Sequence, residues 1–301
     1  VKIMGGSTLY KKKGPLVVFL VPAFLFLIVY LYYPFIQNII NSFCAIGGLG
    51  MPATGVNEPW YLNFVTLCTD PYLRTALWNT LLLTLCTIVF QVGIALVLAL
   101  LVDSICVGAQ VFRTLYFFPI VISATALGLM FNLIFLFKGG MVNQLLLSMG
   151  AITKNIDWKD QAHFLFTMFM PVMWQYVGFY FVILVTGLNN ISQDLYEAAA
   201  LDGASGLKVV RYISLPMLRN VLCTCLVLAI TGALKVFDLP WVMFGAGMPQ
   251  NLGWLTGTYM YDQTFNRGNV DYGSTIAILI VVLGVVLSNV SNRIFRPRDD
   301  I

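Results

Sequence analysis

The residue types in this chain that could recognise a polar solute lie inside long apolar runs. They are amides, a hydroxyl and aromatic rings, namely Gln91, Asn132, Trp174, Gln175, Tyr176, Tyr180 and Thr186. An amide donates to and accepts from hydroxyl groups, and an aromatic face covers apolar C–H groups, so the set suits a hydroxylated solute such as a sugar. Each residue taken singly is also explained as glue between helices. The group from Trp174 to Tyr180 is the predicted centre of a solute pathway.

A second pattern, between Ser192 and Gly203, predicts a short helix with a contact surface. Ser192 can cap this helix, and Asp194 places a negative charge in its first turn. Three- and four-residue steps give it one narrow face of mostly small side chains, made of Leu195, Ala198, Ala199 and Asp202. Gly203 suits a left-handed cap that ends the helix. The predicted product is a knob that presses into a groove on another protein, and a helix that merely lies on a bilayer surface is the alternative.

A second helix is predicted to follow from Ser205. One side of it is apolar and the opposite side is basic, with Leu207, Val210 and Ile213 on the first and Lys208 and Arg211 on the second. Pro216 then opens the next apolar run. The two helices together span the loop 189–216.

The composition identifies an integral membrane protein. Hydrophobic residues make up 59% of the chain, charged residues 10%, and the mean hydropathy is +0.85. Six apolar runs are long enough to cross a bilayer as helices, and runs of this length exclude the alternating pattern of an outer-membrane barrel. The predicted fold class is therefore all-α, a polytopic bundle of six transmembrane helices. The predicted spans are Leu16 to Ile36, Asn79 to Val102, Thr114 to Phe137, Phe164 to Leu188, Met217 to Phe237 and Ser274 to Ile294.

The distribution of basic residues predicts the orientation. Of the 17 Lys and Arg residues, eleven fall on the side of the two termini and six on the other, so both termini and the loop 189–216 are expected in the cytosol. Residues 1–14 form a basic cytosolic tail, and residues 15–301 form one membrane domain. The first apolar run is expected to be a retained span rather than a signal peptide. The net charge of +4 then reflects topology, and nucleic-acid binding is not expected.

Catalytic and metal-binding patterns are missing from the sequence. It contains no G-x-x-x-x-G-K-S/T phosphate loop, no H-E-x-x-H and no pair of carboxylates within a span, so neither an enzyme nor a metal site is predicted. Cys44 and Cys68 share an outer loop, and two unpaired thiols are preferred over a disulfide. His163 is predicted to be an isolated surface residue. Lys235 and Asp238, three residues apart, are expected to pair with each other.

The stretch from Glu197 to Ala204, followed by Ile213 to Pro216, resembles the EAA loop of bacterial ATP-binding-cassette (ABC) importer permeases. Other stretches extend the resemblance over nearly the whole chain, to carbohydrate-uptake permeases of the maltose and glycerol-phosphate type and to the first of their two permease subunits. These stretches are Trp78 to Thr80, Phe118 with Pro119, Trp174 with Gln175, Phe237 with Asp238, and Tyr272 with Gly273. The chain departs from the family at Gly245 to Pro249, where relatives commonly show Gly-Gly-Pro.

The resemblance implies a multi-pass permease of the bacterial cytoplasmic membrane that translocates a sugar, oligosaccharide or polyol. The implied partners are a second, homologous permease in a heterodimer, two ATPase subunits that bind ATP and Mg, and an extracytoplasmic binding protein, while this chain binds no cofactor. The implied ATPase-coupling residues are Glu197, Ala198, Ala199, Asp202, Gly203, Ala204, Leu215 and Pro216. The alternative is an ion-coupled transporter or channel without an ATPase. Ion sites in such proteins usually need acids within the spans or broken helices, and here the acids lie in loops or at span ends.

Overall fold

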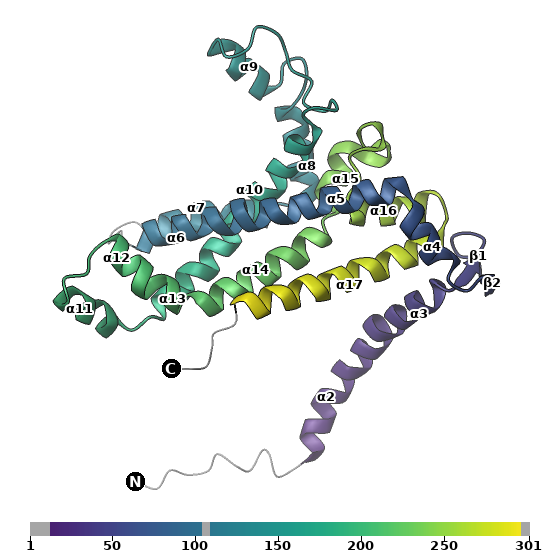
Figure 1. Cartoon of the computed structure of the whole chain (residues 1–301), viewed down its shortest axis with the longest axis horizontal. Helices are drawn as coiled ribbons and strands as arrows, with labels where there is room; N and C mark the ends of the chain where they lie inside the picture. Colours follow the sequence, from purple (N-terminus) through teal and green to yellow (C-terminus); the bar gives the residue numbers. More distant parts are fainter. Residues whose placement is uncertain (1–12, 104–108, 296–301) are drawn as a thin grey trace. The chain divides into compact units, whose positions relative to one another are not determined.

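A computed structural model describes residues 13–103 and 109–295. Most of the predicted tail 1–14 and the thiol of Cys106 lie outside the described residues. The chain divides into two compact units, residues 1–67 with 263–278 and residues 68–262 with 279–301. Within these residues, five helical segments are long and apolar enough to cross a membrane, and one bent pair of helices makes a sixth when it is counted as one span (Figure 1). The predicted number of spans is therefore confirmed.

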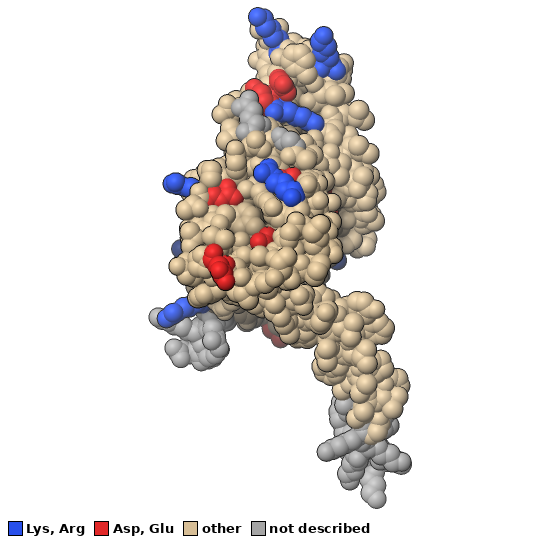
Figure 2. All heavy atoms as spheres, turned by 90° about the vertical axis from the view of Figure 1, so that its right-hand side faces the viewer, with Lys and Arg blue, Asp and Glu red and all other residues tan. Residues whose placement is uncertain are grey.

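The first unit contains the first span and a small β-hairpin. The span runs through α2 (Lys13–Leu27), a π-helical turn η1 (Ile28–Tyr32) and α3 (Tyr33–Asn41). Its membrane-crossing part, Val17–Asn41, has no charged residue, and Figure 2 draws uncharged residues in tan. After it, β1 (Cys44–Ile46) pairs antiparallel with β2 (Ala53–Val56). The predicted all-α class is confirmed, and this loop adds one short hairpin that turn-forming glycines close.

Buried Asn63 organises the rest of the first unit. Its amide donates to Ser42 O at 3.1 Å and lies 3.4 Å from Asp271 Oδ2. It lies on α4 (Leu62–Thr69), while Asp271 lies in the first turn of α17 (Val270–Phe295), which forms the last span. One buried amide therefore joins the end of the first span to the start of the last one.

The second unit holds the remaining helices. They are α5 (Pro71–Cys86), the π-helical η2 (Thr87–Val92), α6 (Gly93–Asp103), α7 (Ala109–Val121), α8 (Ala124–Ile134), α9 (Met141–Ser148), α10 (Phe164–Asn189), α11 (Gln193–Leu201), α12 (Leu207–Val209), the π-helical η3 (Val210–Ser214), α13 (Leu215–Met217), α14 (Arg219–Leu234), α15 (Asp238–Phe244), the 3-10 turns η4 (Gly245–Gly247) and η5 (Pro249–Asn251), α16 (Thr256–Tyr261) and the π-helical η6 (Asp262–Asn266), which continues into the first unit.

Helix α10 is the centre of this unit because it contacts α6, α7, α14 and η2 (Figure 1). Apolar residues of α6, α10 and α14, among them Ala95, Phe181 and Leu184, are buried together. At Gly178 the backbone of α10 comes so close to α7 that a Cβ would overlap the Tyr116 carbonyl group. The close approach of these two helices fixes one wall of the bundle.

The third span is not the continuous helix that the sequence predicts over Thr114 to Phe137. Its two parts, Gln110–Val121 in α7 and Ala124–Ile134 in α8, meet at an angle of 95°. Ser123 caps α8 by accepting from Ala126 N at 3.2 Å. A proline near the end of α7 and a serine that starts a new helix explain the break. The carbonyl of Ile122, freed by the break, faces α10.

Candidate functional site

A cavity of about 300 Å³ lies inside the second unit, among η2, α10 and the end of α14. Four of the predicted pathway residues line it, namely Gln91, Gln175, Tyr176 and Tyr180. They come from α10 and from the π-helical turn within the second span, far apart in sequence. The volume lies at the lower end of the range for small-molecule pockets.

Both glutamines direct the NH₂ group of their side-chain amide at a backbone carbonyl of the protein. Gln91 is 2% exposed, and its Nε2 donates to Val172 O at 2.8 Å. Nε2 of Gln175 lies 3.4 Å from Ile122 O, the carbonyl freed by the break in the third span. Among the described residues, no group donates to Oε1 of either glutamine. Each glutamine is therefore held by a backbone carbonyl and keeps an acceptor for a solute hydroxyl.

The structure does not bring the other predicted pathway residues to this cavity. Trp174 packs edge-on against Phe131 with ring centroids 5.7 Å apart. Asn132 lies 3.4 Å from Val242 O, and its buried Oδ1 has no partner in the described structure. Thr186 donates to the carbonyl of its own helix, at Val182. These three side chains lie between or along helices.

Three polar lining residues were not predicted, namely Thr87, Lys235 and Asp238. The expected pairing of Lys235 with Asp238 is wrong, because these two side chains form no ion pair with each other in the described structure. Helix α14 ends at Leu234 and α15 begins at Asp238, so the helical geometry that brings such residues together is interrupted. A charged residue at the end of an apolar run was the signal available in the sequence.

The loop 189–216 forms the predicted helical knob, and α11 has the predicted ends. Ser192 accepts from Asp194 N at 3.3 Å and caps the start. At the other end Gly203 has φ +74°. There, Gly203 N donates to Ala200 O at 3.1 Å, and Ala204 N donates to Ala199 O at 2.9 Å. These bonds form a Schellman motif, which requires a residue that tolerates the left-handed region.

The exposed face of α11 differs in one respect from the prediction. Glu197, Ala198 and Asp202 are exposed, and Leu201 is 90% exposed, but Ala199 is only 7% exposed and faces the chain itself. The small-residue face is therefore divided between an inner and an outer contact.

The second half of the loop is helical from Leu207, with a π-helical turn in the middle. The residue that caps its start is Gly206. Ser205 contributes only its backbone carbonyl, so the predicted side-chain cap by Ser205 is wrong. Leu207 is 85% exposed and Pro216 is exposed, whereas Leu215 is half-buried. An apolar leucine with this exposure leaves the loop with an uncovered surface.

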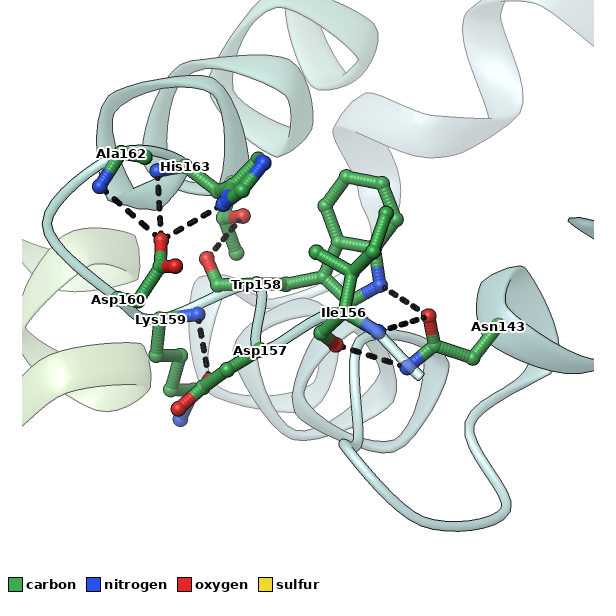
Figure 3. Close-up of polar contacts among 9 residues, drawn as sticks. Asn143, Ile156, Asp157, Trp158, Lys159, Asp160, Ala162 and His163 are labelled. Carbon is green, nitrogen blue, oxygen red and sulfur yellow. Dashed lines mark hydrogen bonds and ion pairs between the residues drawn. The ribbon is translucent and has the colours of Figure 1, made fainter. Parts of the chain in front are cut away.

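The segment between α8 and α10, called the outer segment because the sequence predicts it on the outer side, is organised by Asn143 (Figure 3). This side chain is 1% exposed. It donates to the carbonyls of Leu136, Phe137 and Ile156 and accepts from Ile156 N and from Trp158 Nε1, at distances of 2.9–3.2 Å. The Asn143 side chain thus satisfies backbone groups that regular secondary structure would otherwise pair.

The same segment pairs His163 with Asp160, so the prediction of an isolated histidine is wrong. Nδ1 of His163 lies 2.7 Å from Asp160 Oδ1 (Figure 3). This hydrogen bond lowers the pKa of the Asp160 carboxyl. Nearby, Lys159 Nζ donates to Met243 O at 2.9 Å, at the end of α15, and burial lowers the pKa of this lysine. The outer segment is therefore fastened to α15.

The stretch from Leu252 to Tyr259, which the sequence predicts in the third outer loop, is bound to α5 and its cap. Asn79 Nδ2 donates to the carbonyls of Leu252 and Trp254 at 2.7 and 3.0 Å, and Tyr259 OH donates to Asp70 Oδ2 at 2.6 Å. The rings of Trp254 and Tyr259 are buried. These aromatic residues are part of the core, because their backbone and side chains are bound to the start of the second span.

No group of three or more His, Cys, Asp or Glu side chains within residues 13–103 and 109–295 could hold a metal ion. Cys44 and Cys68 are both free thiols. The cavity and the knob hold residues that the sequence predicts for a solute pathway and for coupling to an ATPase.

Comparison with known proteins identifies the family. The model of the binding-protein-dependent transport system inner membrane component family matches residues 107–299. The probable ABC transporter permease protein YurN of Bacillus subtilis is 30% identical over 281 residues, which are 92% of this chain and 94% of the relative. The arabinooligosaccharides transport system permease protein AraP of the same organism is 30% identical over 94% of this chain and 88% of its own length.

The fold is also that of a solved transporter. A chain of a bacterial ABC transporter involved in the import of the acidic polysaccharide alginate aligns with a TM-score of 0.81 and 21% identity, over 96% of this chain and 98% of that chain. The resemblance to ABC importer permeases seen in the sequence is thus confirmed, and so is the location in the inner membrane. The chain belongs to the family of inner membrane components of binding-protein-dependent transport systems, and it is an ABC importer permease.

Proposed function

We propose that this permease translocates a sugar or oligosaccharide through the cavity beside α10. The observation that carries the proposal is that Gln91, Gln175, Tyr176 and Tyr180, chosen from the sequence for hydroxyl recognition, line one cavity. The relatives support it, because those with named substrates include permeases for arabinooligosaccharides and for lactose. Amide acceptors and tyrosine rings supply the two kinds of contact that a sugar needs.

The knob formed by α11 to α13 is the proposed contact with an ATPase subunit. It presents an exposed acid and exposed apolar residues on one short helix, Glu197, Ala198 and Leu201. The knob lies in the loop that the basic residues place in the cytosol together with both termini. Two ATPase subunits with ATP and Mg, a second and different permease, and an extracytoplasmic binding protein complete the proposed importer.

Two helices connect the knob directly to the cavity. The loop joins the end of α10 to the start of α14, and these two helices both line the cavity. The hydroxyls of Tyr196 and Ser214 lie 3.3 Å apart, and a Cβ at Gly187 would press on Leu218. A displacement of the knob must therefore move α10 and α14 together, as in the sliding and hinge motions of packed helices. ATP acts by favouring one of two such arrangements.

Charge reversal at the knob tests the coupling. Glu197→Lys is expected to abolish ATP-driven uptake and substrate-stimulated ATP hydrolysis in proteoliposomes while membrane insertion and assembly are retained. Glu58→Lys, the same change at the only other glutamate of the chain, also exposed, is the control and should leave both activities intact. Normal coupled uptake by Glu197→Lys would contradict the role of the knob. Uptake driven by an ion gradient without ATP would contradict the importer itself.

A further inference from the structure

The two charged side chains at the cavity, Lys235 and Asp238, have no explanation in the protein's own contacts. Among the described lining residues they are the ones that are charged at neutral pH, since the other polar groups are amides and hydroxyls. Both side chains are exposed, and within the described structure neither forms an ion pair or a side-chain hydrogen bond. They are therefore available to a ligand.

The break between α14 and α15 keeps the two charges apart. Lys235 has φ −102° and ψ 1°, and Phe237 has φ −141° and ψ −58°, so the chain leaves the helix before it reaches Asp238. In a continuous helix, residues at this spacing would lie side by side and neutralise each other. The break leaves an ammonium and a carboxylate as separate groups on the same wall.

Three aromatic rings hold this break in place. Phe237 stacks on Trp241 with centroids 5.4 Å apart and lies 4.5 Å from Tyr261, while Trp241 and Tyr261 are 4.8 Å apart. Phe237 also lines the cavity. The wall thus combines a donor, an acceptor and an apolar ring in fixed positions, which are the contacts that orient a solute with hydroxyls on one side and C–H groups on the other.

We propose that Lys235 and Asp238 are specificity residues that select an uncharged, polyhydroxylated solute over an anionic one. The proposal rests on the proposed transport function. The Asp238 carboxylate accepts hydrogen bonds from neighbouring hydroxyls, and the Lys235 ammonium donates one. Because the two charges cancel, the cavity offers an anion no net attraction that would offset the loss of its hydration. A neutral glycoside has no charge to desolvate, and both groups hold it by hydrogen bonds.

Each charge also suits the helix end on which it lies, with Lys235 at the end of α14 and Asp238 in the first turn of α15. A purely structural role of this kind would affect stability, whereas selection between solutes requires that the two charges set the potential inside the cavity. The test therefore measures that potential directly.

Gly232→Cys supplies a reporter thiol. Gly232 lines the cavity, and a Cβ there meets nothing within 4 Å. The complete importer, with its native cysteines replaced, is placed in lipid nanodiscs and labelled with methanethiosulfonates that are cationic, neutral or anionic. Each rate is divided by the rate of the same reagent with a small free thiol. Val236→Cys, on the same wall, is the second reporter, and Thr224→Cys, on α14 away from the cavity, is the control.

With both charges present, the normalised anionic and cationic rates should agree within about threefold. Asp238→Asn should raise the anionic-to-cationic ratio about fivefold or more, and Lys235→Gln should lower it by a similar factor, because one unit charge a few ångströms away acts on reagents of opposite sign. The ratio at Thr224→Cys should stay constant.

An unchanged ratio at both reporters in either neutralised variant would overturn the proposal, and so would a cavity that no reagent enters. Opposite shifts in the two variants would support it. ATP-driven uptake by the same complexes is measured in parallel. Retained uptake with an unchanged ratio refutes only the charge selection, whereas uptake independent of ATP refutes the proposed function.

Discussion

Gly178 gives the strictest test of how the cavity wall is built. A Cβ at this position would overlap the Tyr116 carbonyl and come within 2.9 Å of Phe117 N. Backbone atoms of a packed helix cannot turn aside, so Gly178→Ala must push α7 and α10 apart. Glycine to alanine within a helix gains about 0.5–1 kcal/mol from helix propensity. Overpacking against backbone costs about 1–3 kcal/mol or more, and the net result should be a loss of roughly 1–2 kcal/mol.

The separation should also reach the cavity. Gln175 lies one turn before Gly178 and holds Ile122 O across a distance of 3.4 Å, which leaves little margin. We expect Gly178→Ala to lower both the melting temperature of the purified importer and its transport rate. Gly232→Ala is the matched control, since its Cβ meets no atom and it should be neutral or stabilising. The reasoning is refuted if Gly178→Ala melts at or above Gly232→Ala and transports at the wild-type rate.

Three further predictions concern the loops. Gly203→Ala should cost about 1 kcal/mol because of its positive φ, and Gly203→Asn less, so coupled uptake should follow the order Gly, Asn, Ala. Asn143→Ala should leave Trp158 Nε1 and four backbone groups buried without partners, at about 1–3 kcal/mol for each group that water does not reach, and limited proteolysis should cut residues 149–163 faster. The lowered pKa of Asp160 means that its bond to His163 stabilises the loop above the ordinary pKa of an aspartate and is lost as the pH falls through the lowered value. Protection of this loop should therefore fall in acid for the wild type, and Asp160→Asn should show lower protection that no longer changes over that range.

Local signals in the sequence were sufficient to locate the apolar spans, though not the break within the third, and to predict the first helix of the knob. Apolar runs long enough to cross a bilayer become helices because backbone groups in lipid must bond within their own segment. The cap at Ser192 and the stop at Gly203 are formed by atoms within a few residues of each other. Such features depend on no distant part of the chain, so they can be predicted from residue type and spacing.

The side-chain arrangement at the cavity could not be predicted in the same way. Gln91, Gln175 and Asn132 are all amide residues within apolar runs, yet only the two glutamines line the cavity. The depth of a residue in a span is readable from the sequence, but the direction it faces depends on how the helices rotate against each other. The aromatic residues around Gln175 separate for the same reason, since Tyr176 lines the cavity and the neighbouring Trp174 packs against α8.

Three segments with irregular helical backbone line the cavity. Gln91 and Thr87 lie on the π-helical turn η2, Ala124 begins α8 just after the 95° break, and Lys235 to Phe237 form the break between α14 and α15. Interrupted helices expose carbonyls that hydrocarbon cannot satisfy, so they persist only where protein or a polar cavity covers them. The bond between Gln175 and Ile122 O is one such compensation. Two helix breaks and one π-helical turn, from three distant segments, meet at this cavity, and this arrangement points to a polar pathway there.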